Sequence, residues 1–227
     1  LRRVVELKKT WPFGDPKTDI AALARLYGFP QWLAVRLIKD LGASDAVALM
    51  KASNEQAPLF IAVNKAKASD QEIVALFADC GITAQPQTID GVEIPGCYFI
   101  SNSKILLDGR IAHALAQGKI LVSDVAAQRV AMLALPEEKP AAFLEIGAGR
   151  GTKTILLQSN AQRKYGSQMK HYTLDNHEFK ARVLRERAEK YGIEVADALT
   201  LDATKMTAED FPELFDAVFV DAPCSGL

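Results

Sequence analysis

The chain has 227 residues and a formal net charge of −1, with 49% hydrophobic and 24% charged residues. This balance is ordinary for a folded globular protein. It excludes wholesale disorder and a global basic field for nucleic acid, so any such partner must be held by a local patch. No apolar run approaches the roughly 20 residues of a membrane span. The three cysteines, Cys80, Cys97 and Cys224, have neither metal-ligand spacing nor an even disulfide set. We therefore expect a cytoplasmic protein without a membrane segment or a metal site.

The N-terminal half mixes helical and extended patterns. Capping residues and terminal glycines mark its helices, and short β-rich runs mark its strands. The predicted elements, in chain order, are helices 18–28, 30–42 and 43–54, strand 58–64, helix 69–81, and strands 82–89 and 97–100. We interpret residues 1–117 as a small α+β module.

After a helix at 124–134 and a polar, proline-bearing linker at 135–142, strands and helices alternate. This alternation predicts a parallel sheet with right-handed crossovers, and ligands of such sheets bind at the carboxyl ends of the strands. On helix 177–191, one apolar stripe is formed by Phe179, Val183, Leu184, Ala188 and Tyr191. The predicted elements are strand 143–146, a glycine turn and helix at 147–158, strand 171–175, helix 177–191, and strands 195–202 and 217–221.

The turn EIGAGRG, residues 145–151, carries three glycines between a strand and a helix. Such glycines let backbone amides and a helix N-terminus approach a ligand, although the same pattern also serves as a plain tight turn. The spacing is not that of a dinucleotide fingerprint, and no phosphate-binding loop is present. The pattern therefore favours a nucleoside-like ligand without phosphates.

Four acidic residues, Glu145, Asp175, Asp202 and Asp221, lie at or beside successive strand ends. Asp175 has the position of a carboxylate that accepts from ribose hydroxyls, and its alternative role is a cap of the next helix. Asp202 could likewise be a turn residue. Together the four predict a site on one edge of the sheet.

Other polar residues are assigned simpler roles. We interpret His113, His171 and His177 as structural or solvated, and Cys80 and Cys97 as small core residues. The Arg- and Lys-rich stretch 163–190 is typical of a solvated helix face, with an RNA-binding patch as the alternative.

The motif DAPCSG, residues 221–226, precedes the last residue of the chain, Leu227. With the acidic glycine turn and the strand-end aspartates, this motif resembles the S-adenosylmethionine-dependent RNA cytosine-5 methyltransferases of the NOL/NOP/Sun group, in the style of the bacterial ribosomal RNA methyltransferase B proteins. Residues 118–135 are similar to the family's segment before the cofactor turn, with Ser123 where glutamine is usual, and 30–37 and 54–69 are similar to its N-terminal RNA-binding module. The turn departs from the family pattern, because Gly147 and Arg150 stand where cysteine and proline are common.

The resemblance implies a class I (Rossmann-like) methyltransferase sheet in residues 118–227, preceded by an RNA-binding module in 1–117. The sheet would be incomplete at its C-terminus, because the family's nucleophilic cysteine on the next strand is not in this chain, and we expect the natural protein to continue. Asp175 would bind the ribose, Asp202 would face the adenine and Asp221 would lie between methyl donor and base. The implied S-adenosylmethionine site consists of Gly147, Ala148, Gly149, Arg150, Gly151, Thr152, Lys153, Asp175, Asp202 and Asp221.

The implied reaction is methyl transfer to carbon 5 of cytosine in RNA, ribosomal rather than transfer RNA. In this chemistry a cysteine thiolate adds to carbon 6 of the base and is later eliminated. Cys224 would assist product release, or act as the nucleophile, or be a structural thiol. The alternatives for the whole protein are an RNA-binding pseudo-methyltransferase without catalysis and a class I methyltransferase with another substrate.

Overall fold

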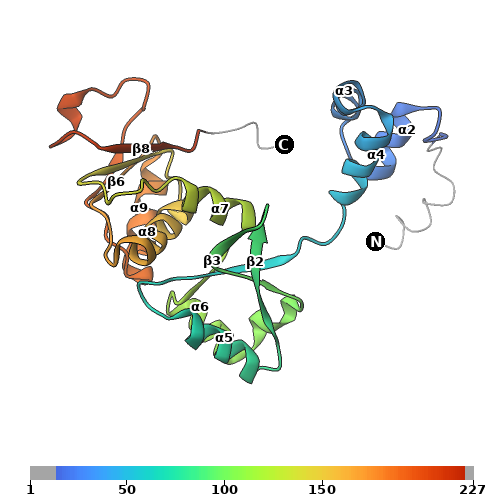
Figure 1. Cartoon of the computed structure of the whole chain (residues 1–227). Coiled ribbons are helices and arrows are strands. Elements are labelled where there is room, and N and C mark those ends of the chain that lie inside the picture. Colours follow the sequence, from blue (N-terminus) through green and yellow to red (C-terminus); the bar gives the residue numbers. More distant parts are fainter. Residues whose placement is uncertain (1–13, 223–227) are drawn as a thin grey trace. The chain divides into compact units, whose positions relative to one another are not determined.

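The computed structural model describes residues 14–222, which divide after Ala57 into two compact units, with described residues 14–57 and 58–222 (Figure 1). The described part of the first unit contains three successive helices: α2 (Ile20–Tyr27), α3 (Gln31–Leu41) and α4 (Ala43–Ala52). Asp19 caps α2 by accepting from the backbone N–H of Ala21, and Gly28 ends it in the left-handed conformation. The predicted helices are thus confirmed. They share a small core made of Leu23, Ala24, Ala34, Ala46 and Met50.

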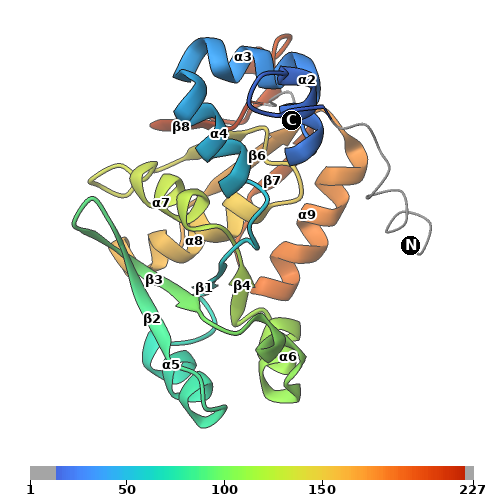
Figure 2. The same ribbon diagram turned by 90° about the vertical axis from the view of Figure 1, so that its right-hand side faces the viewer.

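The second unit begins with an antiparallel sheet. Its strands lie in the order β2-β3-β1-β4, and helices α5 and α6 pack against it through Ile73, Phe77 and Ile111 (Figure 2). The succession β-α-β-β-α-β with this strand order is the ferredoxin-like arrangement. Its elements are β1 (Leu59–Val63), α5 (Asp70–Asp79), β2 (Ala84–Ile89), β3 (Val92–Ile100), the 3-10 helix η1 (Ser103–Leu107), α6 (Gly109–Ala116) and β4 (Ile120–Val122).

Strand β3 starts five residues earlier than the predicted strand at 97–100. The reason is a two-residue hairpin turn at Asp90 and Gly91, both with positive φ (51° and 78°), which joins β2 directly to β3. Pro86 is tolerated in β2 because β2 is an edge strand whose register shifts between Pro86 and Thr88. Cys97 of β3 is buried in the core, as expected, and burial raises the pKa of its thiol to about 12.

A parallel sheet follows, in the strand order β7-β6-β5-β8, with every neighbouring pair parallel. The prediction of a parallel α/β sheet is confirmed. Strands β6 and β7 lie on one side of β5 and β8 lies on its other side, so the strand order reverses between β5 and β8. In open α/β sheets, ligands bind at the carboxyl ends of the strands beside such a reversal. The elements are α7 (Val125–Leu133), β5 (Phe143–Ile146), α8 (Thr152–Tyr165), β6 (His171–Asp175), α9 (Glu178–Tyr191), β7 (Asp197–Thr200), the 3-10 helix η2 (Ala208–Asp210) and β8 (Ala217–Val220).

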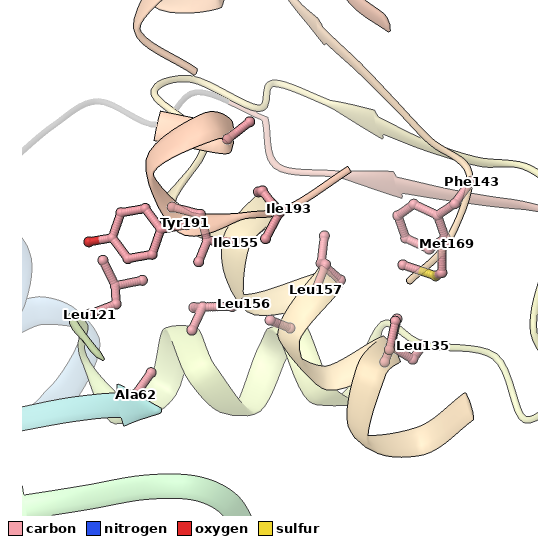
Figure 3. Packing of buried hydrophobic residues seen from close by; sticks show 13 residues of the cluster. Ala62, Leu121, Leu135, Phe143, Ile155, Leu156, Leu157, Met169, Tyr191 and Ile193 are labelled. Atoms are coloured by element: carbon pink, nitrogen blue, oxygen red, sulfur yellow. The ribbon is translucent and has the colours of Figure 1, made fainter. Parts of the chain in front are cut away.

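The two sheets of the second unit share one hydrophobic core (Figure 3). Ala62 of β1 and Leu121 of β4 pack in the same cluster as Phe143 of β5, Leu156 of α8 and Tyr191 of α9. The module boundary expected at 117/118 stays a prediction, although β4 pairs with β1 and so lies in the antiparallel sheet. No helix in residues 14–222 is both long enough and apolar enough to span a bilayer.

Asn64, only 2% exposed, joins the sheets through polar contacts: its side-chain amide donates to the carbonyl oxygens of Gly118 (2.8 Å) and Tyr191 (2.7 Å). Asn64→Ala would leave both carbonyls without this donor, so we expect a loss of about 2 kcal/mol in the free energy of unfolding. Urea titration followed by circular dichroism measures it. Asn176→Ala, at an exposed position of the same unit, should change stability by less than about 0.5 kcal/mol. Equal effects of the two substitutions would contradict this role of Asn64.

Candidate functional site

The glycine turn after β5 is fixed by its backbone. Gly147, Gly149 and Gly151 all have positive φ (80°, 58° and 79°), a conformation that glycine adopts without strain. The N–H groups of Gly147 and Ala148 both donate to the carbonyl oxygen of Leu174, which ties the turn to β6. A Cβ on Gly147 would lie 2.3 Å from the backbone oxygen of Asp221, so only glycine lets the turn pass this close to the end of β8.

Gly149 differs from the other two glycines. A Cβ built there would have the oxygen of Gly147, at 3.9 Å, as its nearest neighbour, whereas one on Gly151 would lie 2.9 Å from Leu184. Gly149 therefore presents its Cα to open space, while Gly151 packs against α9. An open, side-chain-free face next to strand-end carboxylates fits a ligand that approaches the backbone closely, as the nucleoside part of S-adenosylmethionine would.

Asp175, the last residue of β6, is buried and accepts a hydrogen bond from the glycine turn. One carboxylate oxygen accepts from the N–H of Gly149 (3.1 Å) and the other from the N–H of His177 (3.0 Å), and Lys180 lies 3.3 Å away. The sequence left open whether Asp175 is a helix-terminal residue or a ligand-binding carboxylate. In the structure it contacts both the start of the α9 segment and the glycine turn.

Lys153 and Asp221 lie across the point where the strand order reverses. The ammonium of Lys153, in the first turn of α8, is 2.7 Å from a carboxylate oxygen of Asp221, which directly follows β8. Both side chains are partly exposed. The structure therefore brings together two of the predicted site residues as an ion pair that solvent can reach.

Asp202 lies two residues beyond β7 and is more exposed than Asp175. Its carboxylate accepts from the backbone N–H and the hydroxyl of Thr204, and the hydroxyl hydrogen bond holds the pKa of the carboxyl below its ordinary value. These contacts are those of a turn residue. The adenine-facing role of Asp202 stays a prediction.

Glu145 does not lie on the open edge with the aspartates, as the sequence had suggested; it is fully buried. One of its carboxylate oxygens accepts from the hydroxyl of Thr154 (2.7 Å) and lies 3.2 Å from Nε2 of the buried His171. Glu145 precedes the last residue of β5, so its side chain points to the α8 side of the sheet. It therefore contacts α8 and β6 within the core.

Phe179 also departs from expectation. It was assigned to the apolar stripe of α9, but it is 52% exposed, whereas Leu184, Ala188 and Tyr191 are buried. The guanidinium of Arg150, an exposed residue of the glycine turn, lies 5.6 Å from the Phe179 ring centre. Arg187 donates to the carbonyl oxygen of Arg150 (2.9 Å) and to the hydroxyl of Thr152 (3.1 Å). The sequence pattern did not reveal this contact between turn and helix.

Two further residues predicted for the site are Ala148 and Cys224. Ala148 is buried against Leu184 and Ala198, so it packs the turn onto α9 and β7. Cys224, the predicted catalytic residue, lies outside the described residues 14–222. Within that described range, no group of three or more His, Cys, Asp or Glu residues is placed to hold a metal ion.

The sheet order, the glycine turn after β5 and the carboxylates after β6 and β8 together define a class I (Rossmann-like) methyltransferase fold. Solved structures agree: PH0851 superposes with a TM-score of 0.74 at 24% identity, covering 93% of this chain and 45% of that one. NSun6 from Pyrococcus horikoshii superposes with a TM-score of 0.65 at 16% identity, covering 88% and 72%.

Sequence comparison identifies a narrower group of similar proteins among the methyltransferases. The family model described as "Methyltr_RsmF/B-like, ferredoxin-like domain" matches residues 29–96. The ribosomal RNA small subunit methyltransferase B of Xanthomonas campestris is 32% identical over 90% of this chain and 44% of its own length. The Bacillus subtilis protein named "Probable ribosomal RNA small subunit methyltransferase B" is 27% identical over 94% and 45%. The resemblance to NOL/NOP/Sun-type methyltransferases is confirmed, and the chain spans less than half the length of these curated relatives.

Proposed function

We propose that the protein transfers a methyl group from S-adenosylmethionine to carbon 5 of a cytosine in RNA, and that its substrate is ribosomal RNA. The observation that carries this proposal is the juxtaposition of Lys153 and Asp221 beside the open glycine turn, with DAPCSG continuing from Asp221. The named relatives, which are ribosomal RNA small subunit methyltransferases, support the choice of substrate. A cytoplasmic location follows from such a substrate.

The residues of the turn would hold the cofactor. The open face of Gly149 admits a nucleoside, and the buried carboxylate of Asp175 offers acceptors for ribose hydroxyls. Asp202 would face the adenine. The fold-related NSun6 structure was solved with SFG, an analogue of S-adenosylmethionine, which supports the choice of cofactor. When bound, S-adenosylmethionine supplies an electrophilic methyl group on a sulfonium.

The chain's own polar residues would then position the base. Carbon 5 of cytosine is a weak nucleophile until a thiolate adds to carbon 6, and a cysteine suits this step because it forms a thiolate near neutral pH and leaves readily. The ion pair with Lys153 would hold the Asp221 carboxylate in place to accept a hydrogen bond from the base. After methyl transfer a base removes the proton from carbon 5 and the thiolate leaves carbon 6, which restores the double bond; Cys224, three residues on from Asp221, would assist this elimination. The target base must be unstacked or single-stranded to enter such a site.

A methylation assay on the natural gene product carrying this sequence tests the proposal. Small-subunit ribosomal RNA is incubated with methyl-labelled S-adenosylmethionine, and the product nucleosides are separated by chromatography. We expect label in 5-methylcytidine. RNA binding without label transfer would instead identify a pseudo-methyltransferase, and label in another nucleoside would show a different methyl acceptor.

In the same assay Cys224→Ala separates the three roles of this cysteine. If Cys224 releases the product, addition and methylation proceed but elimination stalls, and we expect a covalent protein–RNA adduct that survives a denaturing gel. A nucleophile changed to alanine would give neither adduct nor methylation. Normal turnover by Cys224→Ala would show that the thiol is structural.

A further inference from the structure

The arginines of the described residues 14–222 fall into two groups. Five of them form ion pairs with aspartates: Arg25, Arg36, Arg110, Arg129 and Arg163. The remaining four form no ion pair with any carboxylate of the described residues. These four are Arg150, Arg182, Arg185 and Arg187. All four lie on α9 or on the glycine turn beside it, although α9 itself carries Glu178, Glu186 and Glu189. The uncompensated guanidinium charge is therefore concentrated in one place.

An exposed aromatic ring lies within this group. Phe179, in the first turn of α9, has the guanidinium of Arg150 5.6 Å from its ring centre and that of Arg182 at 5.4 Å. Both arginines are exposed, like Phe179 itself. We call Arg150, Phe179, Arg182 and Arg187 the arginine–phenylalanine cluster.

The cluster is anchored to the proposed cofactor site. Arg187 donates to the carbonyl oxygen of Arg150 and to the hydroxyl of Thr152, which fixes the turn against α9. Phe179 follows Asp175 by four residues. Helix α9 lies on the outside of the second unit, so its exposed face is open to a partner (Figure 2).

We infer that the arginine–phenylalanine cluster binds single-stranded RNA next to the target base, with Phe179 stacking on a base and the arginines contacting phosphates. This inference rests on the proposed RNA substrate. An aromatic face combined with planar guanidinium groups binds unpaired bases without sequence preference, and unpaired arginines release counterions when they meet phosphates. A merely solvated helix face would need neither the exposed ring nor the uncompensated charge. An acidic protein partner would use the charge but not a base-stacking surface.

Fluorescence anisotropy with a labelled, unstructured RNA oligonucleotide tests the inference on the intact protein. We expect Phe179→Ala to weaken binding roughly tenfold and Phe179→Trp to retain it, since stacking on an aromatic ring contributes on that order per base. Arg182→Ala should weaken binding severalfold and lower the slope of log affinity against log salt by about 0.7. The matched control is Arg129→Ala, which also removes one positive charge, from a residue paired with Asp90; it should change affinity less than about twofold.

The outcomes are distinguishable from failure of the proposed function. If the wild type binds RNA and Phe179→Ala binds equally well, the cluster is not the contact, while the RNA substrate stands. If the wild type binds no RNA, both the inference and the RNA substrate are overturned. Equal affinity for a duplex of the same sequence would show that binding depends on phosphate contacts only. It would contradict stacking of Phe179 on an unpaired base. S-adenosylmethionine affinity, measured in parallel by calorimetry, should be the same in Phe179→Ala and wild type.

Discussion

Gly147→Ala is expected to abolish measurable binding of S-adenosylmethionine and to lower the free energy of unfolding by at least about 3 kcal/mol. The added Cβ would lie 2.3 Å from the backbone oxygen of Asp221, and backbone cannot rotate away as a side chain can. The alanine would also have to adopt a φ of 80°, which is strained for any residue with a Cβ. Relief of the collision requires the turn to move away from β8, which separates the proposed cofactor residues from Asp221.

Gly149→Ala is the matched control, because this glycine also has a positive φ but an added Cβ would find its nearest neighbour at 3.9 Å. The control should lose only about 1–2 kcal/mol of stability, from backbone strain alone. Urea titration and calorimetry of both variants measure the comparison. If Gly147→Ala is no less stable than Gly149→Ala, the close approach to β8 has no energetic role. Loss of cofactor binding in Gly149→Ala at near-normal stability would place the ligand against its open face.

Asp175→Asn is expected to weaken binding of S-adenosylmethionine roughly 100-fold. Hydrogen bonds to a charged acceptor contribute about 1.5–3 kcal/mol each, and the amide cannot accept two ribose hydroxyls as a buried carboxylate can. Asparagine keeps one oxygen that can accept from the N–H of Gly149 or His177, so it disturbs the turn less than alanine would.

Calorimetry of cofactor binding, with thermal unfolding recorded without cofactor, separates ligand loss from structural loss. Asp197→Asn serves as the control, because Asp197 begins β7 at the opposite, amino end of the parallel sheet. Cofactor affinity should be unchanged in this variant. Unchanged affinity in Asp175→Asn, in a protein whose wild type binds the cofactor, would remove Asp175 from the site.

Much of the fold was predictable because its signals are local. Capping residues, terminal glycines and the alternation of strands and helices located most of the longer elements. Helix α6 (Gly109–Ala116) and strand β4 (Ile120–Val122) were not predicted, and α8 extends to Tyr165, beyond the predicted end at 158. The early start of β3 was missed although Asp90-Gly91, a strong hairpin signal, stands between two β-rich runs. Pro86 falls within the predicted strand 82–89 and is accommodated because β2 is an edge strand. Pro95 lies in β3, in the stretch between Glu93 and Tyr98 where the register between β2 and β3 shifts.

The site was less predictable because its details depend on contacts between distant residues. The sequence predicted that Asp175 and Asp221 stand at the ends of strands, as they do, but the same rule could not tell that Glu145, one residue before its strand's end, faces the core. Helical periodicity placed Phe179 on the apolar side, but its ring is exposed and lies beside Arg150 of the glycine turn. Whether an arginine has an aspartate partner is likewise a property of the folded chain, as the pairing of Arg163 with Asp70 shows.

The core shared by the antiparallel and parallel sheets has a consequence for how such proteins can be recombined. Leu121 and Ala62, from the ferredoxin-like part, fill space between helices of the methyltransferase part, and Asn64 bonds carbonyls on both sides. If either part were replaced by a homologous one, the replacement would need a matching contact surface, because the two parts are joined by closely packed side chains and not only by a linker. We therefore expect that exchange of one sheet alone lowers stability, unless the residues that contact the other sheet are exchanged with it.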